Sequence, residues 1–146
     1  MSSVGLPDGV LVNARSFGSP RPRERPDYGV YLCAQRARRR QTREWTGTWR
    51  ATWLDWPPLG VPRDSTAAVD ALREAHQRAA RGERVEIACS SGRSRTGTAL
   101  AALAVRAGLE GEEAVAWVKR NYPLASLITR RQRRWLVTVT PELRRG

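Results

Sequence analysis

Short apolar runs alternate along the chain with longer stretches in which apolar residues recur at helical spacing. Runs typical of strands, rich in β-branched and aromatic residues, stand at 10–12, 28–32, 48–54 and 85–89. Helical spacing predicts helices over 65–81, 98–107 and 112–121, and a last helix is expected to begin near Thr129. Strands that alternate with helices predict an α/β fold with a mostly parallel central sheet flanked by helices on both sides. The length favours a single domain over residues 1–146.

Two arginine-rich segments interrupt this pattern. Three prolines between Ser19 and Asp27 predict an exposed Pro/Arg-rich loop near 19–27. Five arginines stand in the eight positions from Arg36 to Arg43. A cluster of this density suits either the solvated face of a short helix or a patch for nucleic acid or acidic substrates.

The most informative stretch is residues 85–97, where a strand gives way to a helix through a loop rich in serine and arginine. We call residues 89–96, Cys-Ser-Ser-Gly-Arg-Ser-Arg-Thr, the cradle. The backbone N–H groups of such a loop point at one spot, and the N-terminus of the following helix adds partial positive charge there. A phosphate group fits this position. The predicted phosphate-binding residues are Ser90, Ser91, Gly92, Arg93, Ser94 and Arg95.

Three residues of the cradle have the chemistry that phosphate transfer needs. Cys89 stands where the positive field stabilises a thiolate, so it is the candidate nucleophile. Arg95 offers a planar fork that holds two phosphate oxygens, and Gly92 lets the backbone turn tightly. Free cysteines are usually buried and inert. The threonine, the strand and the helix nevertheless all fall where phosphate chemistry needs them.

The pattern Cys-x-x-Gly-x-x-Arg-Thr from Cys89 to Thr96 resembles the signature of the cysteine-dependent protein tyrosine phosphatase superfamily. That superfamily includes compact dual-specificity and bacterial tyrosine phosphatases. The resemblance, which extends roughly over residues 48–136, implies two-step hydrolysis through a cysteinyl-phosphate, without a metal or cofactor. It also implies that Cys89 attacks phosphorus, that Arg95 binds the phosphate and transition state, and that Thr96 helps the sulfur leave.

Residues 56–62, Trp-Pro-Pro-Leu-Gly-Val-Pro, resemble the mobile Trp-Pro-Asp loop of the family in every specified position but one. Pro58 stands where the family has an aspartate that protonates the departing alcohol and then activates water. Asp55 is our candidate for the missing general acid, because Trp53-Leu54-Asp55 restores a Trp-x-Asp order. Asp64 is the alternative, although its place before a helix also suits an N-terminal cap.

Gln132 has two interpretations. The family places a glutamine near its last helix to position the hydrolytic water, and Gln132 resembles that residue. Thr129 and Gln132 also have the spacing of a capping box, which would explain the glutamine without any catalytic role.

The charge narrows the range of partners. There are 26 Lys and Arg residues against 14 Asp and Glu, which gives a formal net charge of +12. A field of this sign attracts anionic partners, and the resemblance implies a phosphotyrosine protein as substrate. An RNA 5′-phosphatase, a phosphoinositide phosphatase and a phosphate-binding module with little turnover are the alternatives. RNA is less favoured because no RNA-recognition motif or pattern of base-stacking aromatics accompanies the charge.

Cysteine usage and hydropathy point to the cytoplasm. Cys33 and Cys89 are too few for a disulfide scaffold, and two separate thiols are expected rather than a redox-regulated bond between them. No apolar run approaches the ~20 residues of a membrane span, and the N-terminus lacks a signal-peptide pattern. The sequence leaves the oligomeric state open.

Overall fold

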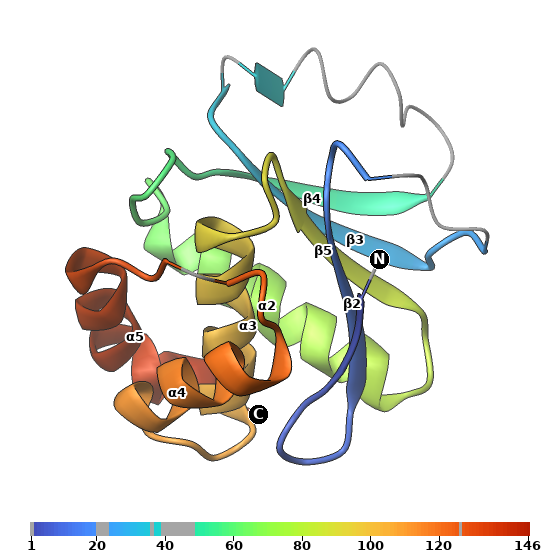
Figure 1. Cartoon of the computed structure of the whole chain (residues 1–146). Helices are drawn as coiled ribbons and strands as arrows, with labels where there is room; N and C mark the ends of the chain where they lie inside the picture. The colour runs from blue at the N-terminus through green and yellow to red at the C-terminus, as the bar shows by residue number, and fades with distance from the viewer. Residues whose placement is uncertain (1, 20–23, 36, 39–48, 126) are drawn as a thin grey trace.

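A computed structural model describes residues 2–19, 24–35, 37–38, 49–125 and 127–146 (Figure 1). Its strands form one five-stranded sheet in the order β1-β2-β5-β3-β4. The edge strand β1 runs antiparallel to β2, and the other three neighbouring pairs are parallel, which confirms the mostly parallel sheet predicted above. The strands are β1 Ser2–Gly5, β2 Leu11–Ser16, β3 Tyr28–Cys33, β4 Arg50–Asp55 and β5 Val85–Cys89.

Four helices lie together on one side of the sheet (Figure 1). The helices α2 and α3 contact the strands, and α4 and α5 pack against α3. On the other face, Ala37, which lies in a short helical stretch with residues 35 and 38, packs against the aromatic cluster described below. The four helices are α2 Ser65–Ala80, α3 Ser94–Arg106, α4 Gly111–Asn121 and α5 Arg130–Leu143.

The central strand β5 is buried on both faces, which explains why four of its five residues are apolar. Side chains alternate along a strand. Ile87 and Cys89 therefore belong to the main core beneath the helices, whereas Ala88 joins a second cluster on the opposite face. That second cluster is aromatic and contains Phe17 and Tyr31. Cys89 thus reaches the C-terminal edge of the sheet on the same face as α3.

A buried ion pair fixes β2 beside β5 just before the cradle. The guanidinium Nε of Arg15 lies 2.7 Å from Oε1 of Glu86, and the hydroxyl of Tyr31 donates to Glu86 Oε2 at 2.6 Å. Buried charges need such partners, because an unpaired charge in the interior is strongly destabilising. The pair therefore joins β2 to β5, the strand that leads into the cradle.

Two helix starts follow the sequence prediction. Asp64 caps α2, where its Oδ1 accepts the N–H of Ala67 at 3.0 Å. Thr129 caps α5, and Gln132 completes the predicted capping box. The helix α3 begins at Ser94 rather than at Thr98, because its first turn is part of the cradle.

The remaining differences lie near the N-terminus. The strand β1 was not predicted, because its short run Ser-Ser-Val-Gly has little strand character of its own and depends on pairing with β2. Residues 20–23 of the predicted loop near 19–27 lie outside the described residues. So do Thr48, at the start of the third predicted strand, and most of the arginine cluster at 35–43.

Candidate active site

The cradle joins the C-terminal end of β5 directly to the N-terminus of α3. Cys89 is the last residue of β5, and its carbonyl accepts the N–H of Phe17 at 3.0 Å. The helix α3 begins five residues later, so the intervening N–H groups and the first turn of the helix share one small space. The structure therefore brings the predicted nucleophile, the phosphate-binding residues and a helix N-terminus together.

Gly92 is the position at which the cradle requires glycine. Its φ is +70°, in the left-handed region, and a Cβ there would lie 3.0 Å from the backbone nitrogen of Ser16. The hydroxyl of Tyr122, at the end of α4, donates to the carbonyl of Gly92 at 2.7 Å. Burial raises the pKa of Tyr122 to about 12, and the nearby Cys89 adds to the rise.

Sequence reasoning did not identify Tyr122 as part of this site. Its partner is a backbone carbonyl, which has no side-chain signature, and it lies 30 positions along the chain from Gly92. The Tyr122 hydroxyl therefore supports the cradle at Gly92, and its raised pKa favours the neutral form that donates this hydrogen bond. A hydroxyl that stays protonated can keep donating to Gly92.

Cys89 and Thr96 are in direct contact. The Thr96 hydroxyl donates to the Cys89 Sγ at 3.0 Å, and Cys89 is only 1% exposed. A hydroxyl that donates to sulfur stabilises negative charge on it, as does the N-terminus of α3. The contact matches the role that the resemblance gives to Thr96.

Arg95 connects the cradle to residues 56–62, which we call the Trp-Pro loop. The guanidinium Nη1 donates to the carbonyl of Trp56 at 3.0 Å, and Arg95 is itself buried. Within the Trp-Pro loop, the Trp56 indole N–H donates to the carbonyl of Gly60 at 2.7 Å. The Trp56 ring meets Trp135 edge to face, with the ring centres 5.4 Å apart. The loop is therefore packed against the cradle.

The two candidate acids occupy different positions. Asp55 ends β4, immediately before the Trp-Pro loop, and its side chain is 33% exposed. Its Oδ1 accepts the N–H of Gln35 at 3.2 Å, and its Oδ2 pairs with Nε of Arg63 at 3.3 Å. Asp64 is engaged in capping α2. Pro58 is exposed within the loop and has no ionisable group.

Gln132 is completely buried and joins three segments. Its Oε1 accepts the hydroxyl of Ser94 at 3.0 Å and the N–H of Thr129 at 2.9 Å. Its Nε2 donates to the carbonyl of Gly60 at 2.9 Å. The glutamine thus contacts the cradle, the cap of α5 and the Trp-Pro loop, and capping accounts for only one of these contacts.

The second cysteine lies on the neighbouring strand. Cys33 ends β3, in register with Asp55, and it belongs to the aromatic cluster on the face opposite Cys89. Burial raises the pKa of the Cys33 thiol, while the positive charge of Arg95 opposes the rise. Both cysteines are free thiols.

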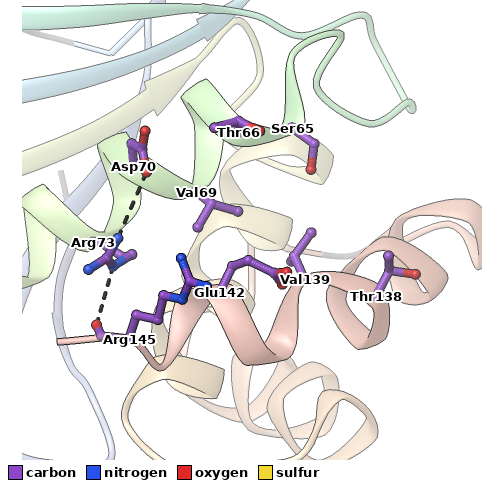
Figure 2. Close-up of a pocket in the computed structure, with 9 residues that line it drawn as sticks. All are labelled: Ser65, Thr66, Val69, Asp70, Arg73, Thr138, Val139, Glu142 and Arg145. Carbon is purple, nitrogen blue, oxygen red and sulfur yellow. Dashed lines mark hydrogen bonds and ion pairs between the residues drawn. The ribbon is translucent and has the colours of Figure 1, made fainter.

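Other features lie apart from the cradle. A groove of about 360 Å³ separates α2 from α5, with Arg73 joined to Asp70 and to the carbonyl of Arg145 (Figure 2). None of the predicted site residues lines it. Within the described ranges, no group of three or more His, Cys, Asp and Glu side chains is arranged to hold a metal ion. No helix in the described part of the chain is both long and apolar enough to cross a membrane.

Comparison with solved structures finds the same fold in phosphatases. Tk-PTP in its active form has a TM-score of 0.66 and 25% sequence identity, over 82% of this chain and 79% of that chain. PTPMT1 in complex with PI(5)P has a TM-score of 0.66 and 19% identity, over 81% and 78%. The human tyrosine phosphatase-like serine/threonine/tyrosine-interacting protein has a TM-score of 0.68 and 13% identity, over 80% and 78%. The last two likenesses show the fold alone.

Sequence comparison identifies the family. No curated protein matches the chain significantly. Residues 25–142, which are most of the chain and include the whole cradle, match the family model of the protein-tyrosine phosphatases. Together with the fold and the strand-cradle-helix geometry, this match shows that the chain belongs to the protein-tyrosine phosphatase family of cysteine-dependent phosphatases.

Proposed function

We propose that the protein hydrolyses phosphomonoesters through a cysteinyl-phosphate intermediate on Cys89. The observation that carries this proposal is the 3.0 Å contact from the Thr96 hydroxyl to the Cys89 sulfur at the N-terminus of α3. In the first step the thiolate attacks phosphorus, an S–P bond forms and the P–O bond to the leaving group breaks. In the second step water attacks phosphorus, the S–P bond breaks, and phosphate and the thiolate are released. Thr96 then donates its hydrogen bond to the departing sulfur.

Arg95 and the amides of residues 90–95 stabilise the transferring phosphoryl group in this proposal. Donors fixed in place before the reaction are effective because they need no reorganisation as charge develops. The contact of Arg95 with the Trp56 carbonyl holds the guanidinium in position and leaves its other N–H groups to face the phosphate. The proposed mechanism uses no metal or cofactor.

Asp55 is the proposed general acid. Its position before the Trp-Pro loop, at the C-terminal edge of the sheet, supports this role, and Asp64 is already engaged as a helix cap. In the first step Asp55 would give a proton to the leaving oxygen, and in the second it would accept a proton from the attacking water. Arg63, which pairs with Asp55, is largely exposed, so the pair can open toward solvent when substrate binds.

The proposed substrate is a phosphotyrosine protein, with dual specificity included, in keeping with the family. A phosphoinositide is the second candidate. It is supported by the net charge of +12 and by the exposed Arg93 within the cradle, which can meet a second anionic group. PTPMT1, which shares the fold, has been crystallised with PI(5)P. RNA is a further anionic candidate and would show binding that weakens steeply as salt rises.

A phosphate-binding module with little turnover is the alternative to an enzyme. Pro58 replaces the acid of the family's loop, and the fold is shared with a phosphatase-like interacting protein. A cradle without an effective acid still binds phosphate.

Two esters separate these proposals. p-Nitrophenyl phosphate has a leaving group that needs little protonation, whereas an alkyl phosphate such as glycerol 2-phosphate needs much. We expect wild type to hydrolyse the aryl ester and Cys89→Ser to abolish turnover while it still binds phosphate. Asp55→Asn should reduce alkyl turnover more than aryl turnover, up to the 10²–10⁴-fold typical of acid catalysis. If wild type hydrolyses neither ester, the enzyme proposal fails; if Asp55→Asn changes neither rate, only the choice of acid fails.

We also propose that the protein acts in the cytoplasm and that it folds as a single domain. Two buried free thiols suit a reducing cytoplasm. One continuous core beneath the helices suits a single phosphatase domain.

A further inference from the structure

We propose that Gln132 is a positioning residue that holds the Trp-Pro loop against the cradle and thereby places the general acid. The inference rests on the proposed function, because it concerns the acid step of that reaction. It assigns Gln132 to the placement of Asp55 rather than to direct contact with the hydrolytic water.

The hydrogen bonds of Gln132 account for most of its side chain. A glutamine amide has two acceptor sites on its oxygen and two N–H donors. Both acceptor sites are taken, by Ser94 and by Thr129, at 3.0 and 2.9 Å. One N–H of the amide nitrogen donates to the carbonyl of Gly60 at 2.9 Å.

This pattern argues against a role in orienting water. A glutamine that accepts a hydrogen bond from the attacking water needs a free acceptor site, and here both sites are occupied. The side chain is also 0% exposed. Capping alone is insufficient too, because a cap needs neither the Ser94 contact nor the Gly60 contact.

The contact at Gly60 continues to the acid and to the cradle. The carbonyl of Gly60 also accepts the indole N–H of Trp56 at 2.7 Å. The carbonyl of Trp56 accepts from Arg95, and Trp56 directly follows Asp55. A chain of buried hydrogen bonds therefore runs from Gln132 through the Trp-Pro loop to the residue next to Asp55 and back to the cradle.

The two residues that flank the Trp-Pro loop, Asp55 and Arg63, are joined by a backbone hydrogen bond. The N–H of Arg63 donates to the carbonyl of Asp55 at 3.0 Å. In the middle of the loop, the Thr129 hydroxyl donates to the carbonyl of Leu59 at 3.3 Å. The start of α5 thus holds the loop at two successive carbonyls, and Gln132 supplies the buried one. Small displacements matter here, because an acid misplaced by about 1 Å can cost on the order of 10²-fold in rate.

The test uses Gln132→Glu, which keeps an acceptor for Ser94 and Thr129 but loses the N–H that Gly60 accepts. Gln132→Met, of similar volume, is the second variant and keeps the test usable if a buried carboxylate prevents folding. Gln77→Leu, on the exposed face of α2, is the control for replacing a glutamine. Each is assayed on p-nitrophenyl phosphate and on phenyl phosphate, whose leaving group is more basic, with wild type and Asp55→Asn as references.

We expect Gln132→Glu and Gln132→Met to slow phenyl phosphate about 10-fold or more, and p-nitrophenyl phosphate only about 2-fold. When Asp55→Asn is already present, the same changes should slow phenyl phosphate no more than they slow p-nitrophenyl phosphate. The reason is that the acid which Gln132 places is then absent. Gln77→Leu should match wild type.

Four results would overturn the inference while leaving the enzyme proposal intact. Equal losses on both esters would mean a purely structural role. A burst of nitrophenolate in the Gln132 variants that Asp55→Asn does not share would mean that Gln132 acts on the attacking water directly and not through Asp55. If a Gln132 variant and Asp55→Asn each slow phenyl phosphate selectively and their factors multiply in the double variant, Gln132 does not act through Asp55. If Asp55→Asn alone changes neither rate, Asp55 is not the acid that Gln132 places. Absence of turnover by wild type would overturn both proposals.

Discussion

The cradle and the Trp-Pro loop meet where Arg95 binds the carbonyl of Trp56, but the two segments are held in different ways. The cradle is short and continuous, and its central contact joins Cys89 to Thr96, only seven positions apart. The Trp-Pro loop depends on partners far along the chain, since Arg95 lies 39 positions from Trp56 and Gln132 lies 72 positions from Gly60. The proposed phosphate-binding loop is therefore set largely by a local stretch of sequence, whereas the proposed placement of the acid depends on the whole fold.

Arg95 belongs to both regions, and replacing it should have the largest effect. Arg95→Lys keeps one positive charge but loses the fork that holds two phosphate oxygens and the carbonyl of Trp56. We expect kcat/KM for both esters to fall on the order of 10²–10³-fold, as for loss of a transition-state donor. Steady-state kinetics on p-nitrophenyl phosphate and phenyl phosphate give the comparison.

The control for this prediction is Arg93→Lys. Arg93 is also in the cradle, but its side chain is exposed, so the same change should cost much less. Equal losses at the two positions would mean that the planar guanidinium is no more important at Arg95 than at the exposed Arg93. The special contact of Arg95 with the Trp-Pro loop would then be irrelevant to catalysis.

Thr96 belongs to the cradle alone, and its replacement should slow the second step, the hydrolysis of the cysteinyl-phosphate. Thr96→Ala removes the hydroxyl that donates to the Cys89 sulfur at 3.0 Å. A hydrogen bond to a charged group is worth about 1.5–3 kcal/mol, which is roughly 10- to 100-fold in rate. We expect hydrolysis of the cysteinyl-phosphate to slow by about this factor, so that the phosphorylated enzyme accumulates. Rapid-quench mass spectrometry would detect the added phosphate on Cys89.

Thr96→Ser keeps the hydroxyl and should restore rapid turnover. If Thr96→Ala slows both steps equally and no phosphorylated enzyme appears, the threonine serves only to shape the cradle. Its effect should in either case be the same for both esters, in contrast to changes in the Trp-Pro loop.

The sequence predicted the cradle well because all its information lies between residues 85 and 97. A buried strand, a glycine in a tight turn and the start of a helix each have a local signature there. The caps at Asp64 and Thr129 were predicted for the same reason.

The contacts of the Trp-Pro loop and of Tyr122 could not be predicted. Arg95, Gln132 and Tyr122 all bind backbone carbonyls, at Trp56, Gly60 and Gly92. Any residue supplies a carbonyl, so no residue type marks the partner. The likeness of residues 56–62 to a Trp-Pro-Asp loop indicated where the loop lies but, with Pro58 present, could not locate the acid.

Tyr122 gives the smallest effect and tests the support beneath the cradle. Tyr122→Phe removes the hydrogen bond to the carbonyl of Gly92. At pH 7 we expect the free energy of unfolding to fall by about 1 kcal/mol, with little change in the ester preference. Chemical denaturation at a series of pH values gives the measurement, and Tyr28→Phe is the control, because burial also raises the pKa of Tyr28 to about 12 but its hydroxyl contacts Thr52.

The sign of the pH dependence follows from the raised pKa of Tyr122. Its pKa is about 12 in the folded chain against 10 for an ordinary tyrosine. The stability linked to the neutral phenol is therefore fully present below pH 10 and is lost as the pH rises toward 12. Tyr122→Phe lacks this loss, so the gap in unfolding free energy between wild type and variant should narrow over that range, as it should for Tyr28→Phe.

Of the two variants, only Tyr122→Phe should also slow turnover, since of the two tyrosines only Tyr122 contacts the cradle. A constant gap from pH 7 to 12 would contradict a buried, neutral hydroxyl beneath Gly92, and an unchanged rate would mean that the cradle keeps its shape without it.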